Sequence, residues 1–523
     1  MRSTGCVVLR RKTAFWNRLS CLGLINRRFI STPLLLATLG IFVSSSPVLG
    51  SDVVPLAKIA PRLASQIASG GSSEALIVFE EQANLSGAAN LPTKLEKGQY
   101  VYDALRAVAE RAQAPMRKLL RDRGIPFQSF YSVNMIKVTA SRDVLYELAG
   151  HNEVLRLDAN PKVQSSIPSP NLSPPNSLNS SQSNDLNSSL LTPTVEWNLA
   201  RVNAPQVWAL GYRGQGMVIA NTDTGVQWDH IALKSHYRGW NGTTANHNYN
   251  WHDATSYHSP TPVDPQFHGT FTMSEMVGDD GKGNQIGVAP GAKWIACRNM
   301  DQHGVGSPAQ YIECFDFMIA PYPIGHPELA NPAMAPDVIN NSWDCPTSEG
   351  CTLSTLQVVE SAVAAAGIFQ SMAAGNYGPS CSTVETTPAI FSSGVGVGAT
   401  DSYNSIARFS SRGPVTVDDS NRLKPELVAP GYNIRAAIPY KNLYQGYWQG
   451  TSMASPHVAA GVALLWQARP SFIGQIDSTT TQLTKTALPL TSTQSCGSLD
   501  GSSIPNAVFG YGLLDILKAI QTP

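Results

Sequence analysis

The chain has 523 residues, more than one ordinary domain needs, and this length favours two to four domains. Apolar residues make up 42% and charged residues 14%, with 42 Gly and 36 Pro, which excludes a fibrous or disordered chain and indicates a loop-rich globular protein. The formal net charge is zero, so no overall basic field favours nucleic acid or an anionic membrane as a partner.

The first 50 residues have the layout of a secretion signal. Residues 1–28 carry several Lys and Arg and no acidic residue, residues 34–43 form an apolar run, and the small residues Val48 and Gly50 follow. The apolar run is shorter than the roughly 20 residues that span a bilayer. We therefore expect residues 1–50 to be a cleaved signal peptide and the protein to be secreted and extracellular, with no stable membrane association afterwards. A retained membrane anchor is the alternative.

Cysteine usage agrees with export. Six cysteines follow the first 50 residues, and an even number in an exported chain suggests disulfides, although six cysteines leave many pairings open. Cys345 and Cys351 flank a short loop and are the easiest pair to close. For the other four cysteines we expect the pairs Cys297–Cys314 and Cys381–Cys496, although the sequence leaves their pairing open.

The sequence pattern of residues 51–163 predicts a small domain in which strands and helices alternate. Apolar residues from Leu105 to Leu120 recur at helical spacing, and Gly124 stands where a helix cap falls. A shorter helix begins after Ser141 and ends at Gly150. Short apolar runs predict strands at 76–79, 135–138 and 154–157.

Residues 164–193 differ in composition from both flanking regions. Ser, Asn and Pro dominate, and such a segment cannot bury enough apolar surface to fold. We expect an exposed, protease-accessible linker.

Residues 194–523 show strands alternating with helices. Helices are predicted to begin near Ser307 and Ser354. This alternation predicts an α/β fold with a doubly wound, mostly parallel sheet, in which reactive groups gather at the carboxyl ends of the strands. Apolar runs typical of strands buried on both faces occur at 217–220, 294–296, 338–339 and 368–369.

Four polar residues stand at the ends of apolar strands or the beginnings of helices. Asp223 follows a strand, while His268 and Ser452 each open a probable helix. Acyl transfer needs these types, because a serine hydroxyl is a poor nucleophile until an imidazole takes its proton, and a carboxylate fixes the imidazole tautomer. The helix N-terminus at Ser452 offers N–H groups where negative charge develops, and the Asn376 amide is a further donor.

These residues stand in motifs that resemble the subtilisin-like serine peptidases, the S8 family. The motifs are Asp223-Thr-Gly, His268-Gly-Thr and Gly-Thr-Ser452-Met-Ala in this chain order, with Ala-Gly-Asn376 as a fourth. The stretch 285–296 is similar to the bacillopeptidase F-like branch. The resemblance covers residues 194–523, and four motifs in the right order make it specific.

The resemblance implies a fold, an activity and roles for individual residues. It implies a subtilisin-like serine endopeptidase that cleaves polypeptide substrates through an acyl-enzyme on Ser452, with Asp223 and His268 completing the triad and Asn376 in the oxyanion hole. Residues 51–163 resemble the family's α+β propeptide, an intramolecular inhibitor and folding aid that keeps the precursor inactive until it is cleaved. No cofactor is required; structural calcium occurs in the family, but no metal ligand is assigned. The implied substrate-binding residues are Ser342, Trp343, Asp344, Ala374 and Gly375.

Two positions depart from the family pattern. Phe271 stands where many members have a second, non-catalytic histidine, so we expect only altered packing there. Asp344 stands where the family usually has Gly. Its carboxylate either lines the specificity pocket and favours basic side chains, or acts as a cap or loop residue beside Cys345.

Two other kinds of protein remain as alternatives. A non-catalytic module of the same fold is disfavoured because all four catalytic positions are intact. A serine esterase is disfavoured because its motif is G-x-S-x-G and its order is Ser, Asp, His. His457 lies on the same helix as Ser452 and is expected to pack rather than catalyse. The loop histidines His247, His252 and His258 match no metal-ligand spacing.

Overall fold

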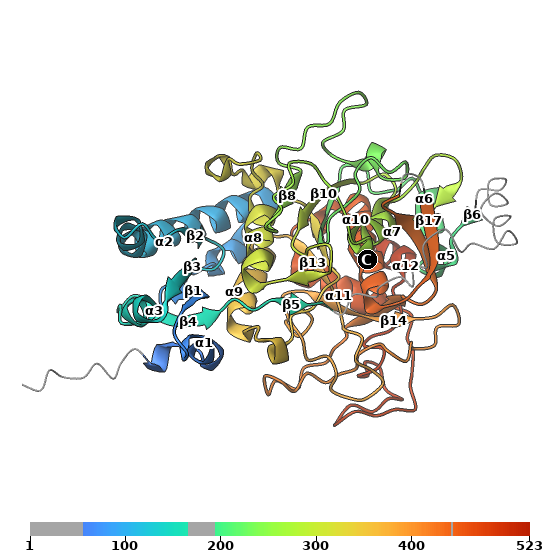
Figure 1. The fold of residues 1–523 in the computed structure, drawn as a ribbon. Helices are drawn as coiled ribbons and strands as arrows, with labels where there is room; N and C mark the ends of the chain where they lie inside the picture. Colours follow the sequence, from blue (N-terminus) through green and yellow to red (C-terminus); the bar gives the residue numbers. More distant parts are fainter. Residues whose placement is uncertain (1–55, 166–193, 441–442) are drawn as a thin grey trace, which may run out of the picture. The chain divides into compact units, whose positions relative to one another are not determined.

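The structure, a computed structural model, describes residues 56–165, 194–440 and 443–523 (Figure 1). The predicted signal peptide and all but the first two residues of the predicted linker lie outside the described residues. Within the described ranges, no helix is long and apolar enough to cross a membrane.

The N-terminal part is a small domain with a four-stranded antiparallel sheet in the order β2-β3-β1-β4. The sequence pattern missed β2 because polar Gln128 and Ser129 interrupt its apolar residues. It also placed the start of α2 too late, since the helix begins at a capping box formed by Thr93 and Glu96. The elements are α1 (Pro61–Ile67), β1 (Ser72–Phe79), α2 (Lys94–Asp122), β2 (Phe127–Phe130), β3 (Met135–Ser141), α3 (Arg142–Ala149) and β4 (Val154–Ala159).

The C-terminal part is built on a seven-stranded, all-parallel sheet in the order β15-β14-β13-β12-β7-β10-β8. This confirms the α/β prediction, and the four predicted apolar runs are all strands. The strands are β7 (Val218–Asp223), β8 (Trp251–Asp253), β10 (Lys293–Arg298), β12 (Val338–Asn341), β13 (Phe369–Ala373), β14 (Val395–Thr400) and β15 (Leu427–Pro430).

Alternating residues of the central strands enter two separate cores. Ala220 and Ile339 pack in the core of α8 (Pro308–Ile319) and α9 (Leu353–Ala365). Ile219 and Val338, one residue earlier on the same strands, pack in the core of α7 (His268–Val277) and α10 (Thr451–Ala468). The sheet is therefore covered on both faces.

The remaining helices and strands are β5 (Val163–Gln164), β6 (Thr194–Val195), α5 (Trp197–Arg201), α6 (Ala204–Ala209), β9 (Asn284–Gln285), β11 (Val305–Gly306), β16 (Ile434–Ile438), β17 (Leu443–Trp448), α11 (Ile476–Thr486) and α12 (Ile516–Gln521).

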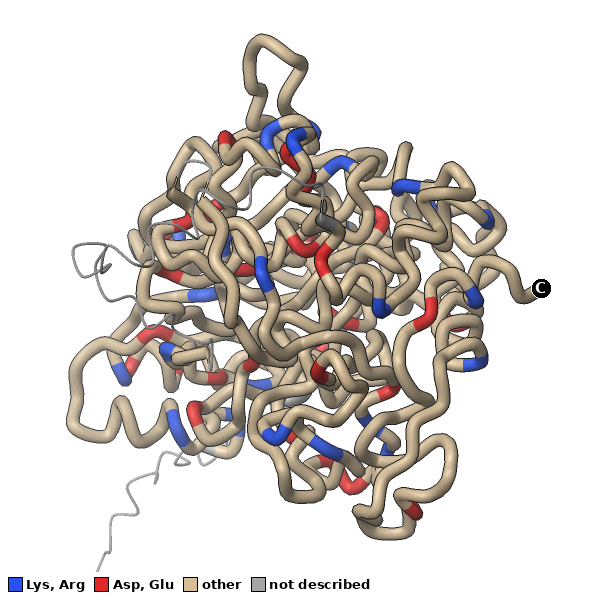
Figure 2. Tube along the Cα trace, turned by 90° about the vertical axis from the view of Figure 1, so that its right-hand side faces the viewer, with Lys and Arg blue, Asp and Glu red and all other residues tan. Residues whose placement is uncertain are grey.

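Disulfides and charges complete the description of the fold. The pairs Cys345–Cys351, Cys297–Cys314 and Cys381–Cys496 are bonded, with Cα–Cα distances of 5.8, 5.5 and 5.5 Å, which confirms the expected pairing. Figure 2 shows Lys and Arg interspersed with Asp and Glu along the chain, and the full sequence has 37 residues of each charge.

Candidate active site

Asp223 and His268 meet because one ends the central strand β7 and the other begins α7. His268 Nδ1 lies 2.9 and 3.0 Å from the two carboxylate oxygens of Asp223, and both side chains are buried. The carboxylate also accepts hydrogen bonds from Thr224 N (2.7 Å) and Thr272 Oγ1 (3.2 Å). With Nδ1 donating to Asp223, the ring presents Nε2 as an acceptor, and this buried atom has no hydrogen-bond partner among the described residues.

The glycines of the two motifs allow this approach. A Cβ added to Gly269 would lie 2.0 Å from the Gly225 carbonyl oxygen, and one added to Gly225 would lie 1.8 Å from the Val263 carbonyl oxygen. Backbone therefore packs on backbone, which positions the Asp223 and His268 side chains. This explains the glycine in both Asp-Thr-Gly and His-Gly-Thr.

Asp264 is a buried residue of this site that the sequence analysis missed. Its carboxylate accepts hydrogen bonds from Thr224 Oγ1 (2.9 Å), Phe267 N (2.9 Å) and Thr270 N (2.7 Å). It thereby joins the loop after Asp223 to the first turn of α7. Burial raises the pKa of Asp264, although the hydrogen bonds from Thr270 oppose this shift.

Ser452 is the second residue of α10 and is tied to Ser342, the residue after β12. Pro456 has no N–H, so the Ser452 carbonyl lacks its helical donor. Ser342 Oγ donates to that carbonyl instead (2.9 Å), and Ser452 Oγ donates to the Ser342 carbonyl (3.3 Å). Between the described atoms Ser452 Oγ and His268 Nε2, no hydrogen bond is formed in this arrangement.

Asn376 is held beside the beginning of α10. Its Oδ1 accepts hydrogen bonds from Thr451 N (2.9 Å) and Thr451 Oγ1 (3.1 Å). Because Oδ1 is used in this way, the Nδ2 amide remains as a donor beside Ser452. The backbone N–H of Ser452, in the first turn of α10, also lacks a helical acceptor. Two donors are therefore available for an oxyanion.

A small cavity adjoins these groups. Four of the residues expected to bind substrate line it, namely Ser342, Trp343, Asp344 and Gly375. Ala373 lines it in place of Ala374, whose N–H donates to the Val397 carbonyl (3.0 Å). Trp343 fixes the cavity wall, since its Nε1 donates to Thr222 Oγ1 (3.0 Å). The lining residues are Ser165, Ser342, Trp343, Asp344, Ala373, Gly375, Asn376, Thr451 and Ser452.

Asp344 is a buried carboxylate in this cavity. Tyr377 Oη donates a hydrogen bond to one of its oxygens, and Ser165 Oγ donates to the other (3.3 Å). Asp344 therefore links Ser165, which lines the cavity, to Tyr377 in the loop after Asn376.

The other histidines do not join the site. His457 is buried, its Nδ1 lies 2.9 Å from the Met453 carbonyl and its Nε2 lies 2.8 Å from Asn198 Nδ2. Burial lowers the pKa of His457 to about 4, so its ring is neutral and structural. In the part of the chain that the structure describes, no three His, Cys, Asp or Glu side chains come together to hold a metal ion.

Comparison with known proteins adds to this geometry. Residues 214–512 match the profile of the subtilase family. Bacillopeptidase F of Bacillus subtilis (strain 168) is 38% identical over 443 residues, which are 82% of this chain and 29% of that protein. Subtilisin E of the same strain is 28% identical over 296 residues, or 55% of this chain and 67% of that protein. The chain thus spans under a third of the length of bacillopeptidase F.

Proposed function

The chain belongs to the subtilase family, a family of serine endopeptidases, and on this premise we propose that it hydrolyses peptide bonds through an acyl-enzyme on Ser452. The observation that carries the proposal is the buried His268–Asp223 pair, whose imidazole offers an unpartnered Nε2. That atom is the acceptor that a serine nucleophile needs.

The reaction begins when the Ser452 hydroxyl turns from the Ser342 carbonyl toward His268. Oγ attacks the substrate carbonyl while Nε2 takes its proton, and the oxyanion forms between Asn376 Nδ2 and the Ser452 N–H. The C–N bond then breaks as His268 returns the proton to the leaving amine. Water hydrolyses the ester by the same steps, with His268 as base. Asp223 stays ionised throughout and stabilises the imidazolium.

Replacing Asn376 with Leu is expected to lower kcat about 10²–10³-fold on a peptide substrate, with little change in KM. The amide is required only when negative charge develops on the carbonyl oxygen. Thr451→Val is the matched control, since it removes the Oγ1 contact with Asn376 but keeps the amide donor. Steady-state kinetics of the two mature variants distinguish the roles; a raised KM at unchanged kcat for Asn376→Leu would contradict an oxyanion role.

Residues 163–165, where the N-terminal domain meets the predicted linker, support an extended mode of substrate binding. β5 pairs antiparallel with β11 in a two-stranded sheet, and Ser165 N donates to the Gly304 carbonyl (3.2 Å). Gln164 N donates to Glu349 Oε2 (2.8 Å), in the loop closed by Cys345–Cys351. Ser165 then enters the cavity beside Ser452. A polypeptide substrate is proposed to add to β11 in the same way.

The same contacts support a self-inhibited precursor. Residues 51–163 are proposed to be the propeptide, and the tail of residues 163–165 then blocks the cleft until a bond within 164–193 is cleaved. Export through the signal at residues 1–50 is part of the proposal, and the three disulfides agree with an oxidising compartment. The mature partners are then polypeptides, and no cofactor enters the chemistry.

A fluorophosphonate probe tests this proposal directly. The probe should form one P–O bond to Ser452 Oγ with loss of fluoride, and casein digestion should fall to background in proportion. Peptide mapping by mass spectrometry locates the adduct. A His268→Ala chain whose propeptide has been removed by added protease should remain unlabelled, because its serine lacks a base. Labelling at another residue, or digestion that persists after complete labelling, would refute the proposal.

A further inference from the structure

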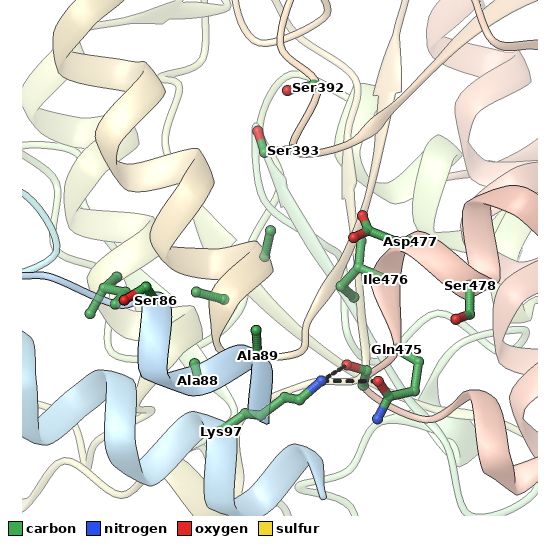
Figure 3. A pocket seen from close by; sticks show the side chains of 14 residues that line it. Ser86, Ala88, Ala89, Lys97, Ser392, Ser393, Gln475, Ile476, Asp477 and Ser478 are labelled. Atoms are coloured by element: carbon green, nitrogen blue, oxygen red, sulfur yellow. Dashed lines mark hydrogen bonds between the residues drawn. The ribbon is translucent and has the colours of Figure 1, made fainter. Parts of the chain in front are cut away.

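Two of the cavities differ in their relation to Ser452. One of about 480 Å³ lies between Lys97 and the loop of residues 474–478, and its lining residues lie outside the proposed active site (Figure 3). Lys97 Nζ donates to two oxygen atoms of that loop, at 2.8 and 3.2 Å. The cavity beside Ser452 differs, because Ser165 from another part of the chain lines it. A bound segment therefore indicates which side chains this second cavity accepts.

The segment 163–165 is bonded along both of its edges. Ser165 N donates to the Gly304 carbonyl beside β11 (3.2 Å). Gln164 N points to the opposite edge, because successive N–H groups of an extended chain alternate, and it donates to Glu349 Oε2 (2.8 Å). One edge thus meets main chain, and the other meets a side-chain carboxylate.

The second edge meets one loop, residues 344–351, which we call the recognition loop. The disulfide Cys345–Cys351 closes it. Cys345 N donates to the Thr387 carbonyl (2.8 Å), and Thr387 Oγ1 donates to the Cys345 carbonyl (3.1 Å). Both acidic residues of the loop bond to the segment 163–165. The disulfide and the hydrogen bonds to Thr387 therefore fix the loop that carries these two carboxylates.

Asp344 contacts a side chain of the segment rather than its main chain. Ser165 Oγ donates to Asp344 Oδ1 (3.3 Å), and Tyr377 Oη donates to Oδ2. Ser165 is 4% exposed and Asp344 is 5% exposed, so the contact is buried. A buried carboxylate that faced an apolar side chain would lose this donor and gain none from water. The site therefore favours a side chain that carries a hydrogen-bond donor.

The size of the cavity limits the length of that side chain. Ser165 Oγ is attached directly to Cβ and reaches the carboxylate of Asp344 from there. The cavity has a volume of about 10 Å³, roughly what a single water needs. A Lys ammonium stands at the end of a four-carbon stem and would need to fold back within this space. The geometry therefore favours Ser or Thr at this position, not the basic side chain that a lone carboxylate would suggest.

We propose that the recognition loop selects the substrate segment that lies along β11. Asp344 selects Ser or Thr at the position of Ser165, and Glu349 accepts the main-chain N–H of the residue before it. This selectivity rests on the proposed function, in which a substrate takes the place of residues 163–165. The substrate class is then polypeptides with a hydroxyl side chain at this position, and both specificity-determining residues lie outside the triad.

Peptides with the sequence of residues 159–172 that differ only at position 165 test the role of Asp344. They are cleaved by the mature enzyme after added protease has removed its propeptide, and mass spectrometry identifies the cleaved bond in each. With Ser at this position, kcat/KM is expected to be about tenfold or more above that with Ala, because a hydrogen bond to a charged acceptor is lost. Thr should follow Ser, and Lys should lie below both.

Asp344→Ala should reduce the ratio of kcat/KM between the Ser and Ala peptides to within about twofold, since the charged acceptor is gone. Tyr377→Phe is the matched control, because it removes the hydroxyl bonded to Oδ2 but keeps the carboxylate. Its ratio should stay above about fivefold. An unchanged ratio in Asp344→Ala would assign the selectivity to another group and overturn the proposal.

A peptide methylated at the nitrogen of Gln164 tests the role of Glu349. It lacks the N–H that Glu349 accepts, and the wild-type enzyme should cleave it with a kcat/KM about tenfold lower than that of the parent peptide. Glu349→Gln keeps an acceptor oxygen and should retain most of this difference, whereas Glu349→Ala should reduce it to within about threefold. An equal difference in Glu349→Ala and wild type would overturn the role of Glu349.

The wild-type enzyme alone can overturn the proposal, even where Asp344→Ala does not accumulate as folded protein. Equal kcat/KM for the Ser and Ala peptides would do so, as would a preference for Lys, which would indicate an ion pair with Asp344 instead. Digestion of casein without cleavage of any of these peptides would also overturn it. Failure of the proposed function appears differently, as no cleavage of casein or of any peptide and no fluorophosphonate label at Ser452.

Discussion

The Ser452→Ala chain is expected to remain at full length and to leave casein undigested, while the wild-type chain loses its N-terminal region and becomes active. Without Oγ no acyl-enzyme forms, and a loss of about 10⁶-fold in kcat is expected from removal of such a nucleophile. Gel electrophoresis shows processing, and mass measurement of the mature fragment should place its new N-terminus within 164–193, after the tail that lies at Ser452.

Two controls make this result decisive. Added protease that removes the propeptide should activate the wild-type chain but not Ser452→Ala, which separates loss of chemistry from loss of processing. If both chains stay full length and neither is activated in this way, the non-catalytic module becomes the better interpretation. If Ser452→Ala processes itself at the wild-type rate, Ser452 is not the nucleophile of maturation.

The residues that we propose to be catalytic could be selected from the sequence because each stands in a short, contiguous motif at the end of a recognisable element. Asp223 follows an apolar strand, and Ser452 opens an apolar helix, so parallel strand topology brings them to one edge. Asp264 was not predictable in this way. Its partners Thr224 and Thr270 are separated from it in sequence, and no periodicity marks a loop carboxylate.

The strands that the sequence did not predict are short or lack a continuous apolar run. β8 has only three residues, and β14 alternates Val with Gly, so neither forms a clear apolar run. The extent of α2 illustrates a different limit. The spacing of Val101 and Leu105 indicates a buried helix face, but the same pattern arises whether the partner is the helix's own domain or the neighbouring one.

Asp223→Asn is expected to lower kcat about 10⁴-fold at neutral pH, with KM little changed. The amide that replaces one carboxylate oxygen donates to His268 Nδ1, so the ring must carry its proton on Nε2. That nitrogen can then no longer accept the Ser452 proton. Because this variant is not expected to process itself, its propeptide is removed by added protease before steady-state kinetics are measured on a peptide substrate.

Asp264→Asn is the matched control, because Asp264 is also a buried carboxylate of this region but bonds the backbone and threonines rather than the His268 ring. It is expected to lower the free energy of unfolding by about 1–3 kcal/mol through weakened hydrogen bonds, while kcat per titrated active site stays within about tenfold of wild type. A similar loss of kcat in both variants would mean that disturbed packing, not the histidine tautomer, explains the effect of Asp223→Asn. A large loss confined to Asp223→Asn assigns that carboxylate to orienting and stabilising the imidazole that serves Ser452.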